Sequence, residues 1–240
     1  MKQMIDKPII GITVDFLNHK SYSKYPWYAL KKNYADAISS FGGVPILLSC
    51  NTRNIADYVK IIDGLIITGG DFDIDPHYYG QNITSETVRI NSTRTNFEIE
   101  ILRQFLDLNR PVLGICGGMQ LINIIKGGSL IQDIAEEMGS SFHKQGMPKH
   151  ITTHTARIKN GTILHNILQK EIIDVNTSHH QAVKTLGDGV ILSAEAPDKI
   201  IEAVEIPDYK FCLGIQWHPE YLETNADKQI FKAFIQAIGK

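Results

Sequence analysis

A cysteine stands in a setting typical of a nucleophile. Cys116 follows a short apolar run, 112–115, of the kind that forms a buried parallel strand. Gly114 precedes it and Gly117 and Gly118 follow it, and the apolar residues beyond recur at helical spacing. The pattern predicts a strand, a sharp turn and a helix, which together make the thiol form of a nucleophile elbow. A sulfur at a helix N-terminus also feels the positive end of the helix dipole, which favours the thiolate.

A base and an orienting carboxylate follow another predicted strand. The run 211–217 has an apolar strand pattern, and His218-Pro-Glu220 comes directly after it. Because the carboxyl ends of parallel strands meet at one edge of a sheet, we expect His218 close to Cys116. Histidine titrates in the range needed to exchange a proton with a thiol, and a nearby carboxylate can hold its other ring nitrogen. The sequence therefore predicts a catalytic triad of Cys116, His218 and Glu220.

The elements that must position these residues alternate between strand and helix in the first half of the chain. Such alternation predicts an α/β fold with a parallel sheet and helices on both faces. The predicted strands here are 9–14, 44–48, 65–67 and 112–115, and the predicted helices lie around 27–41, 55–62 and 101–106. The second half shows strand patterns at 151–158, 172–176, 190–194, 200–206 and 211–217, then an amphipathic helix at 226–238. With no linker or repeat in the sequence, we expect one domain, 1–240.

Composition and charge exclude several classes of partner. Of the 240 residues, 43% are hydrophobic and 21% charged, as in ordinary soluble globular proteins. A net charge of -2 gives no electrostatic attraction to nucleic acid or to an anionic membrane, so neither is expected. The first residues lack an apolar signal region, and no apolar run approaches the roughly 20 residues that span a bilayer.

The cysteines bear on the cellular compartment. There are three, Cys50, Cys116 and Cys212, and they form no Cys-x-x-Cys pair. An odd number of widely spaced cysteines fits the reduced thiols of a cytoplasm. The expected partner is a small-molecule substrate, and the sequence leaves the oligomeric state, a homodimer included, open.

Further motifs, taken with these, resemble a known family. Gly114-Ile-Cys-Gly-Gly-Met-Gln120 and Gln216-Trp-His-Pro-Glu220 resemble a class I glutamine amidotransferase domain. The segments 68–80, 127–133 and 175–181 narrow the resemblance to the peptidase C26 branch, that of γ-glutamyl-γ-aminobutyrate hydrolase. The resemblance covers about 9–220. It implies a flavodoxin-like three-layer sandwich with a mainly parallel central sheet.

The resemblance also implies an activity and a set of site residues. The activity is hydrolysis of a γ-glutamyl amide through a γ-glutamyl thioester on Cys116, without metal or other cofactor. The backbone N–H groups of Gly70 and Gly117 correspond to the family's oxyanion hole. The residues that match the family's substrate pocket are Gln120, His179, His180 and Gln181.

The chain departs from the family pattern at three places. Gly117 stands where C26 hydrolases carry Arg, Thr95 replaces the Asp of an Arg-Asp pair, and Lys199 replaces the Gly of an Asp-Gly pair. None of these changes touches the triad. They bear instead on recognition of the part of the substrate beyond the scissile bond, for which 71–93 and 141–150 are the expected binding segments.

Two other functions stay open at this stage. A glutaminase subunit would pass ammonia to a synthase partner, and the chain contains no synthase domain of its own. A catalytically silent binding protein could use the same fold, although an intact triad disfavours it. The Ser-His-His-Gln segment, 178–181, favours the hydrolase.

Two metal-like patterns are interpreted as structural. The segment Asp71-x-Asp73-x-Asp75 resembles the start of a calcium loop, but Pro76 occupies the required glycine position, so we expect a solvated loop. His150 and His154 have the i,i+4 spacing of metal ligands on a helix. The residues between them favour a strand, which would separate them by about 13 Å. No phosphate-binding glycine motif appears in the sequence.

Overall fold

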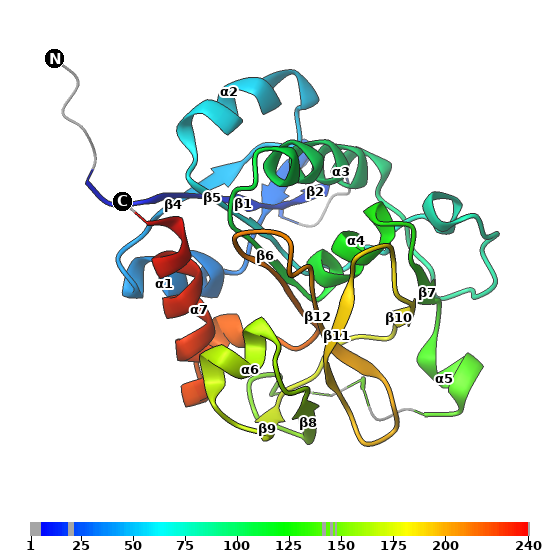
Figure 1. Ribbon diagram of the computed structural model, residues 1–240. Helices are drawn as coiled ribbons and strands as arrows, with labels where there is room; N and C mark the ends of the chain where they lie inside the picture. The colour runs from blue at the N-terminus through cyan, green and yellow to red at the C-terminus, as the bar shows by residue number, and fades with distance from the viewer. Residues whose placement is uncertain (1–5, 19–21, 141–142, 145, 147, 240) are drawn as a thin grey trace, which may run out of the picture.

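A mixed sheet forms the centre of the molecule and carries helices on both faces (Figure 1). The computed structural model describes residues 6–18, 22–140, 143–144, 146 and 148–239. Within them the sheet has nine strands. In order across the sheet these are β4 (Val44–Leu48), β1 (Ile9–Thr13), β5 (Gly64–Ile67), β6 (Val112–Ile115), β13 (Cys212–Ile215), β12 (Ile201–Glu205), β11 (Ile191–Glu195), β8 (His154–Ile158) and β9 (Ile172–Val175).

Strand direction changes half-way across this sheet. The five strands from β4 to β13 are parallel, and each strand from β13 to β9 runs antiparallel to its neighbour. The central pair, β6 and β13, is in register from Val112 opposite Cys212 to Ile115 opposite Ile215. Both strands therefore end level at the same edge of the sheet, which is the edge where Cys116 and His218 emerge.

Each face of the sheet is covered by helices with apolar stripes. Figure 1 shows α1 (Lys32–Ser40), α6 (Ile163–Leu168) and α7 (Asn225–Ile238) on one side, where Ile38, Leu164 and Phe231 are buried in one core cluster. On the other side α2 (Ile55–Ile61), α3 (Ser92–Asp107) and α4 (Gly117–Ile125) bury a second cluster that includes Phe105 and Met119. The predicted three-layer α/β architecture is confirmed. Among the described residues, no helix is both long enough and apolar enough to cross a bilayer.

One predicted helix begins later than the sequence pattern indicated. The segment 27–41 was expected to be helical, but α1 starts at Lys32, and Trp27–Ala29 forms β3, antiparallel to β2 (Asp15–Leu17). Aromatic residues suit a strand as well as a helix face, and Tyr28 packs against Phe16 across this pair with ring centroids 5.7 Å apart. The helical spacing of the apolar residues was therefore misleading in this segment.

Several short elements were not predicted from the sequence. A two-stranded antiparallel sheet joins β7 (Ser129–Ile131) to β10 (Ala182–Thr185), and α5 (Ile134–Met138) follows β7. Three-residue turns of helix lie at η1 (Thr52–Asn54) and η3 (Pro219–Tyr221), and η2 (Pro76–Tyr79) has four residues. Elements this short contain too few residues for a hydrophobic period to be recognised.

Candidate active site

Cys116 occupies a strained turn between β6 and α4. Its backbone dihedrals are φ 53° and ψ -108°, a conformation that residues with a Cβ rarely adopt. The neighbouring glycines permit this turn because the chain approaches itself closely there. A Cβ on Gly118 would collide with the carbonyl of Ile67, and one on Gly114 would lie 2.6 Å from the backbone of Gly118. The observed turn has the geometry of a nucleophile elbow.

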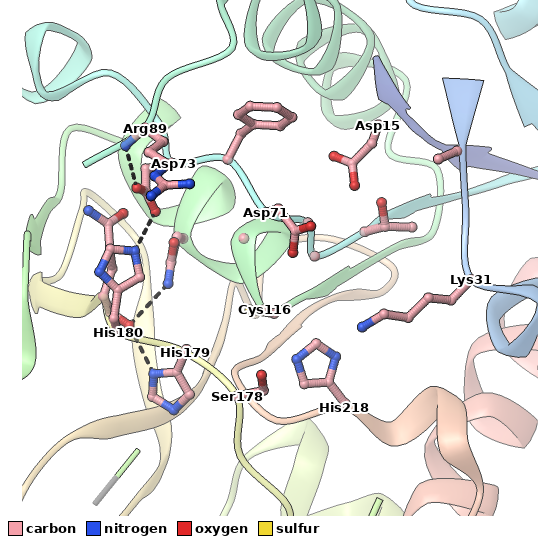
Figure 2. Close-up of a pocket in the computed structure, with 18 of the residues that line it drawn as sticks. Asp15, Lys31, Asp71, Asp73, Arg89, Cys116, Ser178, His179, His180 and His218 are labelled. Carbon is pink, nitrogen blue, oxygen red and sulfur yellow. Dashed lines mark hydrogen bonds and ion pairs between the residues drawn. The ribbon is translucent and has the colours of Figure 1, made fainter. Parts of the chain in front are cut away.

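His218 lies beside this cysteine (Figure 2) and forms a buried pair with Glu220. The Nδ1 atom of His218 lies 2.8 Å from Oε1 of Glu220, and Cys116 is close enough to the imidazole to influence its pKa. Burial alone would lower the pKa of His218, but the charge of Glu220 and the contact with Cys116 raise it to about 10. The structure thus brings Cys116, His218 and Glu220 together at the edge where the sequence placed them.

An asparagine that is not among the predicted site residues holds His218 in place. Asn176, directly after β9, donates from Nδ2 to the carbonyl of His218 at 3.0 Å and accepts the His218 N–H at 2.8 Å. Both residues are buried. This pair of hydrogen bonds ties the end of β13 to the end of β9. The signal available in the sequence was only the position of Asn176 inside the 175–181 motif.

Two backbone N–H groups are available to bind an oxyanion. Gly117 begins α4, and Gly70 lies on the loop after β5. In the described part of the chain, neither N–H donates a hydrogen bond to the protein. Both residues line the same pocket as Cys116.

Arg94 supports the loop that carries Gly70. From α3 its Nη2 donates to the carbonyls of Thr68 at 2.6 Å and Gly69 at 3.2 Å, while Nε donates to Glu98 and Nη1 to Asp15. A Cβ at position 70 would collide with this guanidinium, so any larger residue there would have to displace Arg94. In the sequence, Arg94 stood out only as the residue before Thr95, one of the departures from the family pattern.

The site opens into a pocket of about 1080 Å³. Figure 2 shows Lys31 pointing into it near Cys116 and His218, with Asp15 and Asp71 across the space. Both segments expected to bind the substrate beyond the scissile bond contribute to the lining. Their described lining residues are Asp71, Phe72, Asp73, Glu86, Thr87, Arg89, Lys144 and Lys149.

The other predicted pocket residues line this cavity but bond chiefly to one another. Gln120 donates from Nε2 to the carbonyl of Gln181 and to Oε1 of Gln216, both at 3.2 Å. His179 donates from Nδ1 to the same Gln181 carbonyl at 2.9 Å, and its Nε2 faces the carboxylate of Glu202. These side chains form the pocket wall, and their contact with substrate stays a prediction.

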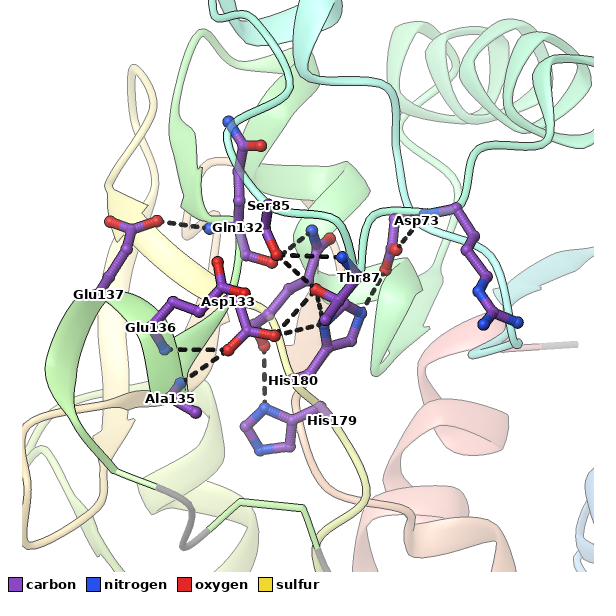
Figure 3. A network of polar contacts seen from close by, with 12 residues as sticks. Asp73, Ser85, Thr87, Gln132, Asp133, Ala135, Glu136, Glu137, His179 and His180 are labelled. Atoms are coloured by element: carbon purple, nitrogen blue, oxygen red, sulfur yellow. Dashed lines mark hydrogen bonds and ion pairs between the residues drawn. The ribbon is translucent and has the colours of Figure 1, made fainter.

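His180 lies at the centre of a polar network that fixes the 71–93 segment (Figure 3). Its Nε2 lies 2.9 Å from Asp73, and its Nδ1 is 3.3 Å from Thr87 and 3.4 Å from Asp133. The hydrogen bond with Asp73 is the main reason that the pKa of His180 is raised. Asp73 also accepts the Arg89 N–H at 2.8 Å and is only 11% exposed. The expectation of a solvated loop is therefore wrong at Asp73.

His150 and His154 do not form a metal-binding pair, as the sequence predicted. His150 is exposed in a turn, whereas His154 begins β8 and is buried. His154 instead packs against His143, with ring centroids 5.0 Å apart, and its Nε2 lies 3.1 Å from Glu202.

Comparison with known proteins shows the family. The model of the peptidase C26 family matches residues 8–220. The chain belongs to the peptidase C26 family. Among its relatives is a protein of Rickettsia prowazekii described as glutamine amidotransferase-like, 39% identical over 98% of this chain and 99% of that one.

Two further matches lie at greater distance from this C26 protein. The γ-glutamyl-γ-aminobutyrate hydrolase PuuD of Escherichia coli is 26% identical, covering 99% of this chain and 96% of its own. A crystal structure of a Thermoplasma acidophilum protein, described as one of the subunits of GMP synthase, superposes with a TM-score of 0.65 at 17% identity, covering 98% of this chain and 96% of that one. The latter shows a shared fold, and the family as a whole is one of hydrolases and amidotransferases.

Proposed function

We propose that this C26 protein hydrolyses the γ-glutamyl amide bond of a small γ-glutamyl compound, releasing glutamate and an amine. One observation carries the proposal: the strained Cys116 contacts the buried His218–Glu220 pair at the wall of a large pocket. The relationship to the hydrolase PuuD supports the choice of bond.

Acylation starts from a thiolate–imidazolium pair. With a pKa of about 10, His218 keeps its proton at neutral pH, and Cys116 reacts as the thiolate because that is the nucleophilic form of a thiol. The sulfur attacks the γ-carbonyl carbon to form a C–S bond, and the N–H groups of Gly70 and Gly117 hold the resulting oxyanion. When the carbonyl re-forms, the C–N bond breaks and His218 gives its proton to the departing nitrogen. A γ-glutamyl thioester and a free amine result.

Deacylation uses the same residues in the reverse roles. Neutral His218 now takes a proton from water, whose oxygen attacks the thioester carbonyl. The C–S bond breaks, glutamate leaves, and the thiolate and imidazolium are restored. Glu220 orients the imidazole and stabilises its charge, and Asn176 fixes the backbone from which it projects.

The shape of the pocket favours a substrate with a tail over free glutamine. A volume of about 1080 Å³ exceeds what a glutamyl group fills, and charged residues of 71–93 line the remainder. Position 117 adds room, since a Cβ there would have no neighbour closer than the Thr68 carbonyl at 3.8 Å. Binding of a tail can position the amide and lower the barrier, which ammonia as a leaving group cannot do.

A substrate panel tests this function. We expect at least one γ-glutamyl alkylamine or γ-glutamyl amino acid to exceed glutamine in kcat/KM by roughly ten-fold, about 1.4 kcal/mol. Glutamate release from each compound would be followed by mass spectrometry, with Cys116→Ser as the inactive control.

The same panel separates the competing functions. Glutamine as the best substrate, with turnover that rises when a synthase is added, would identify an amidotransferase subunit. Release of no glutamate from any compound, together with no acyl adduct on Cys116 after rapid acid quench, would identify a silent binding protein.

A further inference from the structure

A buried cluster of imidazoles surrounds one carboxylate next to the pocket. Its members come from four segments that are far apart in the sequence: the α5–β8 connection, β8, the β9–β10 connection and β12. Every side chain is at most 2% exposed. We call this group the histidine cluster. It consists of His143, His154 and Glu202, whose ligand atoms all lie within 4.8 Å of one another, and of His179, whose Nε2 lies 3.8 Å from Glu202.

The spacing of the cluster suits a tetrahedral metal ion. Measured to Oε1 of Glu202, the nitrogens lie at 3.1 Å for His154 Nε2, 3.3 Å for His143 Nδ1 and 3.8 Å for His179 Nε2. Ligand atoms placed about 2.0–2.1 Å from a tetrahedral zinc ion are about 3.4 Å apart. The separations from Oε1 bracket that value, and the ligand atoms of His143, His154 and Glu202 all lie within 4.8 Å of one another. An ion among them would draw the nitrogens closer together, with His179 moving in as the fourth ligand.

The hydrogen bond of His179 to a backbone carbonyl leaves its other ring nitrogen, Nε2, unprotonated and facing the carboxylate of Glu202. A carbonyl can only accept, so the 2.9 Å contact with the Gln181 carbonyl requires the proton to be on Nδ1 of His179. In neutral His179 the lone pair is then on Nε2, which is buried and has no hydrogen-bond partner among the described residues. Oε2 of Glu202 is buried and lacks a partner in the same sense. Two electron-pair donors that face one another are stabilised by a shared cation.

His143 repeats this arrangement with a carboxylate behind it. Its Nε2 lies 3.0 Å from Oδ2 of Asp198, which fixes the donor on that side of the ring and turns Nδ1 toward Glu202. A histidine that binds a metal through one nitrogen typically donates from the other to a carboxylate or a backbone carbonyl. Both kinds of contact occur here: His143 contacts the carboxylate of Asp198, and His179 donates to the backbone carbonyl of Gln181.

We propose that the histidine cluster is a binding site for a divalent transition metal ion, with zinc as the preferred occupant. Three imidazoles and one carboxylate suit zinc in donor type and in number. Because all four positions are supplied by the protein, the ion would have no open position for substrate. Its role is to tie together the four segments, two of which also carry pocket-lining residues, Lys144 and His180.

The experiment measures metal binding itself and is independent of the proposed catalytic function. Tag-free protein carrying Cys116→Ser would be used, so that neither a histidine tag nor the active-site thiol binds the ion. We expect one zinc per chain by mass spectrometry of the metal, and X-ray absorption with nitrogen and oxygen neighbours at about 2.0–2.1 Å and no sulfur. After removal of zinc with a chelator, added Co²⁺ should give the visible bands of a tetrahedral complex and raise Tm.

Three variants locate the site. His154→Asn removes one ligand and should abolish stoichiometric binding, whereas His150→Asn changes an exposed histidine four residues away and should leave it unchanged. Asp198→Asn weakens only the outer contact, and we expect zinc affinity to fall by roughly 10–100-fold.

Two results would overturn the proposal. In the first, the purified protein contains no stoichiometric zinc and gives no tetrahedral bands with Co²⁺. The cluster would then be a hydrogen-bonded network held together by protons. The other is unchanged zinc affinity in Asp198→Asn, a variant that keeps every ligand and so tests the site even if His154→Asn fails to fold.

Discussion

At the scale of single residues, Cys116, the proposed nucleophile, occupies a strained backbone conformation. A non-glycine residue at φ 53° and ψ -108° is unfavourable by about 1–3 kcal/mol. The turn persists because β6 and α4 are both buried and determine its ends. The strain places the sulfur beside His218, so stability is given up for the geometry of the site.

This strain predicts a difference between two inactive variants. Both Cys116→Ala and Cys116→Gly remove the nucleophile and should abolish turnover. Glycine adopts the turn without strain, so Cys116→Gly should be more stable to urea than Cys116→Ala by roughly 1 kcal/mol, despite its greater loss of chain entropy on folding. Turnover by Cys116→Ala would show that Cys116 is not the nucleophile. If Cys116→Ala were more stable than Cys116→Gly, the backbone at this position would not be strained.

The raised pKa of His218 predicts the pH dependence. The proposed acylation needs protonated His218, so kcat/KM should fall as the pH rises through about 10. Glu220→Gln removes the largest contribution that raises this pKa, so the alkaline limb should move to lower pH while measurable activity remains. An alkaline limb at the same pH in both proteins would contradict the role given to Glu220.

The same pKa has a consequence for stability. A pKa raised above its unfolded value of about 6.5 stabilises the fold fully below that pH, and the stabilisation is lost as the pH rises through about 10. The difference in unfolding free energy between wild type and His218→Asn should therefore shrink between pH 6.5 and 10. Urea unfolding at several pH values measures it.

Lys31 predicts how the glutamyl group is held. Its ammonium points toward Cys116 and His218 in Figure 2 and can pair with the α-carboxylate of the substrate. Lys31→Met should raise KM by roughly three- to five-fold with little change in kcat, since an exposed ion pair contributes up to about 1 kcal/mol. Lys32→Met is the matched control, because Lys32 pairs with Asp36 on the surface. Equal KM values for the two variants would show that Lys31 does not bind the substrate.

At the scale of elements, the start of α4 is set by its approach to β5. Gly117 and Gly118 are adjacent in sequence but differ in surroundings. A Cβ on Gly118 would collide with the Ile67 carbonyl, whereas one on Gly117 would make only ordinary contacts near 3.8 Å. The glycine that the close packing requires is thus Gly118, whereas the role proposed for Gly117 needs only its backbone N–H.

An alanine at each position tests this distinction. Gly118→Ala should push α4 away from β5, lower Tm and reduce turnover by at least roughly ten-fold, because the elbow moves with the helix. Gly117→Ala should keep both the fold and most of the activity, since alanine retains the N–H. Thermal unfolding monitored by circular dichroism and glutamate release give the two readouts, and a tolerant Gly118→Ala would contradict the packing argument.

At the scale of the whole molecule, one sheet joins the two halves of the chain. β6 from the first half and β13 from the second pair over four residues, and the core on each face draws on both halves. The proposed catalytic pair, Cys116 and His218, is assembled across this junction. Neither half therefore holds a complete site.

The continuous sheet predicts a single cooperative unfolding transition. Trp217 is buried in the second half, and Trp27→Phe would leave it as the sole tryptophan. Its fluorescence should then change at the same urea concentration as far-UV circular dichroism, which reports all helices and strands. Two separated transitions would show that the chain folds as more than one unit.

Much of the fold and the outline of the site were predictable because their signals are local. The apolar run before Cys116, the glycines around it and the helical spacing after it lie within about a dozen residues. The alternation of strands and helices was likewise visible in the spacing of the apolar residues, and the resemblance to the C26 family followed from short motifs. Errors arose where local preference was ambiguous, as at Trp27–Ala29, which became β3.

Tertiary structure alone decided which distant residues support the site. The register of β6 with β13 places Cys116 next to His218. The hydrogen bonds of Asn176 to His218 and of Arg94 to Thr68 each join segments that are tens of residues apart in the sequence. The histidine cluster draws on four segments with no recognisable spacing. Hydrophobic period and short motifs encode what each stretch of chain can form, but contacts between stretches depend on how the packed helices and strands bring them together in space.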